Sequence, residues 1–132
     1  MNISEEMLMS GRRDVLEKFG LKIESDKEGT ARSELELQDR HWNLYHMPYG
    51  GVQFNMADIT AGAAFLTAGG YGVTASGNVD FLRPPAKDTK KLYCKAEVRK
   101  MGRRVSFVDA EVSDDAGTQL ATYSFVFVNT EA

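Results

Sequence analysis

The chain has 132 residues, of which 42% are hydrophobic and 27% are charged, and its formal net charge is −3 at pH 7. This length is that of one ordinary domain, so we predict a single domain over residues 1–132. The small negative charge argues against a general nucleic-acid-binding protein. The single cysteine, Cys94, excludes an intrachain disulfide and a cysteine-rich zinc cluster, and no metal site is predicted.

The first twenty residues are charged throughout and lack an uninterrupted apolar core, which argues against a signal peptide. The run from Val52 to Val73 approaches membrane-spanning length, but polar residues and glycines interrupt it and no basic flank is near. The run is better explained as a buried helix. We therefore expect a cytoplasmic protein with no membrane partner.

The first third of the chain is predicted to contain a helix and a hairpin. Residues 3–19 fit a helix that Ser4 caps and Gly20 ends. Residues 21–25 and 30–37 alternate polar and apolar side chains, the period of half-buried strands, and a charged turn joins them. The segment 38–49 is predicted to be a loop, because Pro48 argues against a helix there.

A long helix is predicted next, from Gly51 to Ala68, ended by the pair Gly69-Gly70. One apolar stripe along it holds Val52, Met56, Ile59, Ala63 and Leu66. The other sides are also apolar or small, which predicts burial on most sides. Asp58 is the one charge in this helix, and an isolated buried carboxylate is costly without partners.

Four strands are predicted in the second half, at 72–82, 90–101, 105–113 and 119–128, with turns at 101–104 and 114–117. In the first of them, one face is expected to carry Val73, Ala75, Gly77, Val79 and Phe81, and the other Thr74, Ser76, Asn78 and Asp80. A long helix and a run of antiparallel strands indicate an α+β fold with the sheet wrapped on the helix.

Several short motifs follow one another in a specific order. They are Asn43, Gly50-Gly51, Ala57-Asp58, Phe81-Leu82-Arg83-Pro84, the "GRR" at 102–104 and the "DDAGTQLAT" at 114–122. In order and spacing the chain resembles the hotdog fold, in which a curved antiparallel sheet wraps a long central helix. More narrowly, it resembles the phenylacetate-pathway-type (PaaI-like) acyl-CoA thioesterases. Two positions depart from the family motif: His46 stands where the family has Gly, and Tyr49 where it has His.

The resemblance implies chemistry for two residues. The Gly51 N–H begins a helix and has no intrahelical acceptor, so it suits the task of polarising a thioester carbonyl. Asp58 suits the task of a general base on water or of a nucleophile that forms an anhydride, and the sequence leaves both open. The alternatives are that Gly50-Gly51 only makes a turn and that Asp58 is a structural carboxylate.

Roles for the remaining site residues also rest on the resemblance. Asn43 corresponds to an Asn that positions the carbonyl or the water, although a loop Asn is commonly a turn former. Thr74 corresponds to a Ser or Thr that reaches the water from the partner subunit, although threonine is also a good strand former. Tyr49 either contributes its hydroxyl to the pocket or packs. His41 and His46 are expected on a surface loop.

Substrate binding is predicted for Gly50 and Tyr49 near the carbonyl and for Arg103 and Arg104 at a hairpin tip, where arginines suit the phosphates of coenzyme A. Arg83 and Lys87 are weaker candidates of the same kind. Coenzyme A is part of the substrate, and no separate cofactor is expected. Neither a nucleotide-cradling loop nor a nucleophilic Ser or Cys motif is present in the sequence.

The preferred function is that of an acyl-CoA thioesterase. A non-catalytic acyl-CoA-binding protein is the alternative, and a hydratase or dehydratase ranks low because neither His lies in a suitable context. Hotdog chains usually pair sheets edge to edge, so we expect a homodimer and a dimer of dimers. The active sites are expected at the dimer interface, with Asp58 and Gly51 from opposite chains. The acyl group is not predicted.

Overall fold

A computed structural model of the chain describes residues 18–130. The predicted helix at 3–19 lies outside the described residues, apart from Lys18 and Phe19, which are helical. The described elements are strands β1 (Leu21–Glu24) and β2 (Thr30–Glu36), the short 3₁₀ helix η1 (Asp39–His41), helix α3 (Gly50–Thr67), and strands β3 (Gly72–Phe81), β4 (Lys91–Lys100), β5 (Val105–Asp114) and β6 (Gln119–Asn129). The predicted order of strands and the long helix is confirmed.

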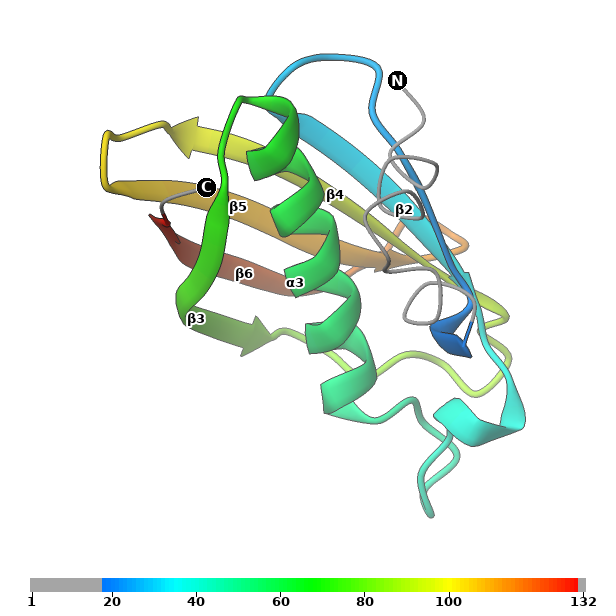
Figure 1. Cartoon of the computed structure of the whole chain (residues 1–132). Helices are drawn as coiled ribbons and strands as arrows, with labels where there is room; N and C mark the ends of the chain where they lie inside the picture. The colour runs from blue at the N-terminus through cyan, green and yellow to red at the C-terminus, as the bar shows by residue number, and fades with distance from the viewer. Residues whose placement is uncertain (1–17, 131–132) are drawn as a thin grey trace.

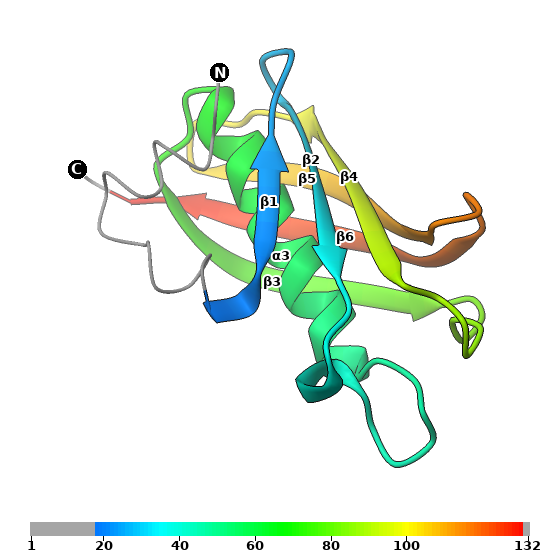
Figure 2. The same ribbon diagram turned by 90° about the vertical axis from the view of Figure 1, so that its right-hand side faces the viewer.

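The six strands form one antiparallel sheet in the order β1-β2-β4-β5-β6-β3. Figures 1 and 2 show that this sheet curves around α3, which lies along its inner face. Strand β3 follows α3 in the chain but does not pair with β2. It crosses to the far edge and pairs with β6.

The core lies between the inner face of the sheet and α3. Leu35, Leu92 and Phe125 are fully buried on the strands, and Met56 and Ala57 are fully buried on the helix. Small helix residues let the helix approach the sheet closely. Each large side chain removed from water in this layer contributes about 1.5–3 kcal/mol of folding free energy.

Helix α3 begins and ends as the glycines predict. The Tyr49 carbonyl accepts hydrogen bonds from the Val52 and Gln53 N–H groups, at 2.9 and 3.4 Å, which starts the first turn. At the other end, Gly69 adopts φ = 92°, and the Gly70 N–H donates to the Phe65 carbonyl at 2.9 Å. This left-handed geometry favours glycine and closes the helix.

The predicted burial of α3 is only partly correct. The buried face holds Gln53, Met56, Ala57, Thr60, Ala61, Ala63, Ala64 and Phe65. An opposite stripe of Gly51, Asn55, Asp58, Gly62 and Leu66 is exposed or half-buried. The sheet covers only one side of the helix, so the expectation that Asp58 is buried on most sides is wrong for a single protomer. The predicted apolar stripe is correct in part: Met56 and Ala63 are buried, Val52 and Ile59 pack against the core, and Leu66 is exposed.

Strand β3 is an exposed edge. Eight of its ten residues are exposed and two are half-buried, although the sequence suggests one buried face. Gly77 explains how the strand still packs on the core: a Cβ there would lie 2.8 Å from the Phe54 ring and 2.9 Å from the Phe125 ring. No strand within residues 18–130 pairs with the outer edge of β3, and Val73 and Phe81 near its two ends are exposed.

Candidate active site

Asp58 and Thr74 form a hydrogen-bonded pair between α3 and β3. The Thr74 hydroxyl donates to Asp58 Oδ1 at 2.7 Å, within one chain. Asp58 is half-buried in the middle of α3, and Thr74 is exposed near the start of β3. The bond fixes one carboxylate oxygen, while the exposure of the pair leaves the carboxylate accessible to water or a ligand.

A β-bulge explains why Thr74 faces the helix. Strict alternation places Thr74 on the same face as Ser76, away from the helix. In the structure the pairing between β3 and β6 shifts between Thr74 and Ser76, so that Ala75 is an extra residue. Thr74 then lies opposite Phe127 and on the face of Gly77, which looks toward α3. Bulges commonly redirect a side chain beside a functional site.

The start of α3 offers an accessible backbone donor. Gly50 and Gly51 occupy the first turn, where N–H groups lack an acceptor four residues earlier. Gly51 is exposed, and a Cβ built on it would meet nothing within 4 Å, so a ligand can approach the backbone there. A Cβ on Gly50 would lie 3.2 Å from the Phe81 ring. Phe81, which is 52% exposed, therefore forms an apolar wall beside the helix start.

Gly51 and Asp58 lie on the same exposed stripe of α3 but not in contact. Seven residues separate them, which is nearly two turns and about 10 Å along the helix axis. A carbonyl held by an N–H donor sits about 3 Å from it. One thioester therefore cannot meet the Gly51 N–H and the Asp58 carboxylate of the same chain at once.

Asn43 uses its side-chain oxygen to hold a turn. Its Oδ1 accepts hydrogen bonds from the Tyr45 N–H at 2.8 Å and from the Met47 N–H at 3.2 Å. The Asn43 N–H also donates to the Met47 carbonyl at 2.8 Å. These contacts fit the turn-forming role. The amide NH₂ of Asn43 has no acceptor within residues 18–130 and remains free to donate.

The residues that depart from the family motif sit in distinct settings. Tyr49 is 51% exposed at the helix start, and its N–H donates to the His41 carbonyl at 3.0 Å. His46 is exposed and adopts φ = 58°, a left-handed conformation that explains why the family motif has Gly there. Among residues 18–130, the Tyr49 hydroxyl makes no hydrogen bond.

His41 contradicts its expected surface position. It is only 2% exposed, its Nδ1 accepts the Gln38 N–H at 2.9 Å, and its ring lies edge-on to Phe19. Burial, together with the nearby Arg40 charge, lowers the pKa of His41 below its usual 6.5. The short helix η1 folds this side chain inward, which a polar loop sequence does not reveal.

Cys94 is buried and unsuited to nucleophilic attack. Burial raises the pKa of its thiol to about 12, so it stays protonated near neutral pH. Its inner-face neighbours include the Ser33 and Thr60 hydroxyls, which lie 2.6 Å apart. Within residues 18–130, no group of three His, Cys, Asp or Glu side chains is arranged to hold a metal ion. No described helix is both long and apolar enough to span a membrane.

The predicted phosphate-binding arginines are exposed at two ends of the molecule. Arg83 follows β3 at the end near Gly50, where Phe81 lies. Arg103 and Arg104 lie in the β4–β5 turn, and the Arg104 carbonyl accepts the Asn129 N–H opposite the start of β3. Ion pairs found between residues 18 and 130 involve none of these three arginines. The protomer does not bring them together.

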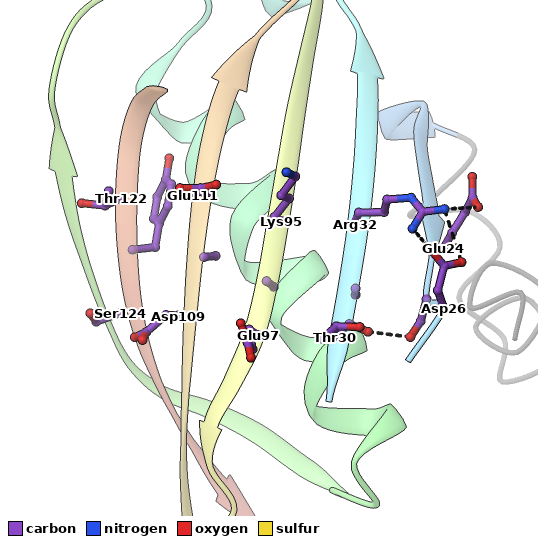
Figure 3. Close-up of a pocket in the computed structure, with 15 residues that line it drawn as sticks. Glu24, Asp26, Thr30, Arg32, Lys95, Glu97, Asp109, Glu111, Thr122 and Ser124 are labelled. Atoms are coloured by element: carbon purple, nitrogen blue, oxygen red, sulfur yellow. Dashed lines mark hydrogen bonds and ion pairs between the residues drawn. The ribbon is translucent and has the colours of Figure 1, made fainter. Parts of the chain in front are cut away.

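A separate groove of about 690 Å³ crosses the outer face of the sheet. Figure 3 shows its labelled residues, which come from the β1–β2 hairpin and from β4, β5 and β6. Five lining residues are acidic, namely Glu24, Asp26, Glu97, Asp109 and Glu111, against the basic residues Arg32 and Lys95. Arg32 is already paired with Glu24 and Asp26. This groove contains no predicted site residue, and its charge disfavours phosphates.

Three solved structures share this architecture. The PaaI protein of the E. coli phenylacetic acid degradation operon is 23% identical, with a TM-score of 0.87 over 96% of this chain and 91% of that chain. A conserved Pseudomonas aeruginosa protein is 27% identical, with a TM-score of 0.81 over 88% and 93%. A Streptococcus pneumoniae hypothetical thioesterase solved with coenzyme A is 21% identical, with a TM-score of 0.78 over 87% and 96%. The chain therefore has the predicted hotdog fold.

The family follows from the sequence match. The thioesterase superfamily matches residues 46–121, which is more than half of the chain. The chain belongs to the thioesterase superfamily. No curated protein matches it significantly.

Two features of the site are difficult to predict from the sequence. Phe81 is predicted as a motif residue and as part of a strand face, and in the structure its ring also forms the wall beside Gly50. The signal was present, because an aromatic residue ends the strand just before Pro84-Pro85. The hydrogen bond between Thr74 and Asp58 within one chain was hidden by the bulge, since the sequence shows no sign of an extra residue.

Proposed function

We propose that this protein is an acyl-CoA thioesterase that hydrolyses a thioester to a free acid and coenzyme A. The observation that carries the proposal is the accessible Asp58 carboxylate held by the Thr74 hydroxyl at 2.7 Å, in a member of the thioesterase superfamily. A paired, half-buried carboxylate and an open helix start are the two kinds of group that acyl transfer needs, and the helix carries both, about 10 Å apart.

The reaction assigns one task to each group. The Gly51 N–H binds the thioester carbonyl oxygen, where negative charge develops. Asp58 takes a proton from water while the water oxygen attacks the carbonyl carbon. Alternatively, Asp58 attacks the carbon itself and water then hydrolyses the anhydride. In both routes the carbon–sulfur bond breaks, the sulfur leaves as the thiolate of coenzyme A, and the acid product keeps the new oxygen.

A neighbouring structure supports the Asp58–Thr74 assignment. The pneumococcal thioesterase was also solved as two variants, in which an aspartate and a threonine sixteen positions apart are each replaced by alanine. Asp58 and Thr74 have the same separation of sixteen residues. We assign both residues to the reacting centre, with Thr74 orienting the carboxylate.

The complete site is proposed to need two copies of the chain. The edge of β3 exposes unpaired backbone groups and apolar side chains, a surface suited to pairing with another strand. Thr74 lies near the start of β3 and Phe81 at its end, about 23 Å apart for an extended strand. Antiparallel pairing of two β3 strands about a two-fold axis places the start of one beside the end of the other.

This pairing joins groups that one protomer keeps apart. Asp58 and Thr74 of one chain come beside the Gly51 N–H of the other. Arg103 and Arg104, near the start of β3, come beside Arg83, which follows the end of the partner's β3. The convergence of three unpaired arginines near each carbonyl site suits the phosphates of coenzyme A. Two such dimers then associate into a tetramer.

Replacement of Asp58 tests the activity directly. Wild type, Asp58→Ala and Asp58→Asn are assayed for thiol release from aromatic, short and long acyl-CoAs. Asn keeps the acceptor oxygen for Thr74 and loses only the charge. We expect both variants to lose at least about 10²-fold in kcat with preserved thermal unfolding. If the wild-type protein binds every acyl-CoA but cleaves none, the proposed thioesterase activity is wrong and the protein is better described as a non-catalytic acyl-CoA-binding protein.

A further inference from the structure

The β4–β5 turn, residues 101–104, carries Arg103 and Arg104, which are exposed and make no ion pair within residues 18–130. The turn does not close itself, since in the described chain no backbone hydrogen bond joins two of its own residues. Ordering such a turn costs conformational entropy that other contacts must offset. Two side chains from outside the turn make these contacts, and the proposed reaction gives neither of them a task.

Asn129, the last residue of β6, holds the turn from one side. Its Nδ2 donates to the Arg103 carbonyl at 2.7 Å and to the Gly102 carbonyl at 3.2 Å. Its backbone N–H donates to the Arg104 carbonyl at 2.8 Å. Three consecutive carbonyls are thus bound to one residue. Because peptide groups are planar, these bonds fix the backbone on both sides of each arginine Cα and set the direction in which each side chain leaves it.

Ser106 holds the turn from the other side. The Gly102 N–H donates to Ser106 Oγ at 3.2 Å, and Ser106 is fully buried. A Cβ on Gly102 would overlap the Val105 carbonyl, so this close passage of the backbone requires glycine. The shape of the turn is therefore set before a ligand arrives, which lowers the entropic cost of binding.

The held turn lies at the same end of the molecule as the Asp58–Thr74 pair. In the sheet, Ser106 lies opposite Phe127, and Phe127 lies opposite Thr74. Two strand spacings, about 10 Å, therefore separate Ser106 at the base of the turn from Thr74 of the same chain. Figure 2 shows the turn at the end of the molecule where α3 finishes and β3 begins. The arginines are thus near the reacting carboxylate but apart from it, as the phosphates of coenzyme A are apart from its thioester.

We propose that Asn129 is a positioning residue for the phosphates of coenzyme A. Its amide holds the backbone of the turn so that Arg103 and Arg104 meet the phosphate oxygens in one fixed arrangement. Arginine binds phosphate through paired hydrogen bonds that depend on direction as well as on charge. The inference rests on the phosphate-binding role that the proposed function gives to these arginines, and it requires no contact from a second copy of the chain.

The test compares two thioesters of the same acyl group, one of coenzyme A and one of N-acetylcysteamine, which has no phosphates. In Asn129→Ala we expect the KM for the acyl-CoA to rise about three- to tenfold with kcat nearly unchanged. The dissociation constant of free coenzyme A, measured by calorimetry, should rise by the same factor. On the N-acetylcysteamine thioester we expect kcat/KM within about twofold of wild type.

A combined variant separates positioning from a purely structural role. Arg103→Ala with Arg104→Ala should raise the KM for the acyl-CoA by at least about tenfold. When Asn129→Ala is added to this pair, we expect no further rise, because the amide acts through the arginines. A residue that only stabilised the fold would add its own effect in both backgrounds.

Asp114→Ala is the matched control, because Asp114 holds the β5–β6 turn in a similar way. Its Oδ1 accepts two backbone N–H groups of that turn at 3.0 and 2.8 Å, at the other end of β5. We expect lower thermal stability and an unchanged KM for the acyl-CoA. Ser106→Ala covers the case in which Asn129→Ala does not fold. It releases the Gly102 N–H, and we expect the same selective rise in the KM for the acyl-CoA.

The outcomes distinguish this inference from the proposed function. An equal loss of kcat/KM on both thioesters, or a further rise of KM in the combined variant, overturns the positioning role of Asn129. A double arginine variant that keeps the wild-type affinity for coenzyme A also overturns it and leaves the thioesterase activity standing. If wild type cleaves neither thioester, the proposed function fails. The dissociation constants of coenzyme A then decide the inference, and an unchanged value in Asn129→Ala overturns it.

Discussion

At the scale of single residues, the Asp58 carboxylate accepts a hydrogen bond from the Thr74 hydroxyl. A bond of 2.7 Å to Oδ1 orients the carboxylate and leaves its second oxygen for the proposed reaction. We expect Thr74 to orient the Asp58 carboxylate and not to accept the proton itself, because a hydroxyl is a weaker base than a carboxylate. Its loss should therefore reduce the rate without abolishing it.

Replacing Thr74 tests this orientation. Thr74→Ser keeps the donor, and we expect a kcat within about threefold of wild type. Thr74→Val keeps the shape and loses the donor, and we expect kcat to fall about tenfold with little change in KM. Steady-state kinetics on one acyl-CoA measures both. Equal kcat values for the serine and valine variants contradict an orienting hydrogen bond.

A second residue links stability to pH. His41 has a lowered pKa because burial disfavours its charged form. Below about pH 6.5 the unfolded chain takes up a proton that the folded chain does not, so stability falls as the pH drops toward the folded pKa. The slope is at most about 1.4 kcal/mol per pH unit.

The test compares chemical unfolding of wild type and His41→Gln between pH 7.5 and 5.5. We expect wild type to lose more stability over this range, because the variant cannot titrate there. His46→Gln, at an exposed histidine, controls for the removal of a ring. Identical pH profiles for wild type and His41→Gln are incompatible with a buried neutral His41.

At the scale of elements, the first turn of α3 is accessible to a ligand at Gly51, and the Gly51 N–H has no acceptor within the helix. Proline is tolerated in the first turn of a helix, because the missing N–H has no intrahelical acceptor there. Gly51→Pro therefore removes the proposed carbonyl donor with little change to the helix. We expect thermal unfolding close to wild type and kcat lower by about 10²–10³-fold, as for other lost donors of this kind.

Gly51→Ala is the matched control for the helix start. A Cβ there meets no atom within 4 Å, and alanine keeps the N–H. Alanine is also the better helix former, so we expect a gain of up to about 1 kcal/mol in unfolding free energy. If the proline variant is as active as the alanine variant, the Gly51 N–H does not polarise the substrate.

Strand β3 depends on one glycine for its packing. A methyl group on Gly77 overlaps the Phe54 and Phe125 rings at 2.8 and 2.9 Å, so Gly77→Ala should cost about 1–3 kcal/mol of unfolding free energy. Ser76→Ala, on the neighbouring exposed position, should change stability by less than about 0.5 kcal/mol. Urea unfolding measures both, and equal midpoints contradict the close approach of the rings.

At the scale of the whole molecule, the fold could be predicted further than the site. Alternation and turn residues placed the six strands, and the glycine pairs bounded α3 to within one residue. The order of motifs identified the fold class. These features are local in sequence, so a single chain reveals them.

What could not be predicted depends on contacts across the sequence. The covered side of α3 is set by the curvature of the sheet, and the direction of Thr74 by one extra residue in β3. The burial of His41 follows from a single turn of 3₁₀ helix. Asp58 was expected to be buried, and in the protomer it is half-buried. In the proposed dimer, a second copy of the chain pairs with the β3 edge and covers the exposed side of α3.

The central claim is that each active site combines Asp58 of one chain with Gly51 of another. Mixing the inactive variants Asp58→Ala and Gly51→Pro, unfolding them together and refolding them tests it most directly. Random assembly makes half of the dimers mixed, and each mixed dimer has one intact site, so we predict recovery of about a quarter of wild-type activity. Mixed dimers that form, as shown by co-purification of differently tagged chains, but remain inactive contradict the claim.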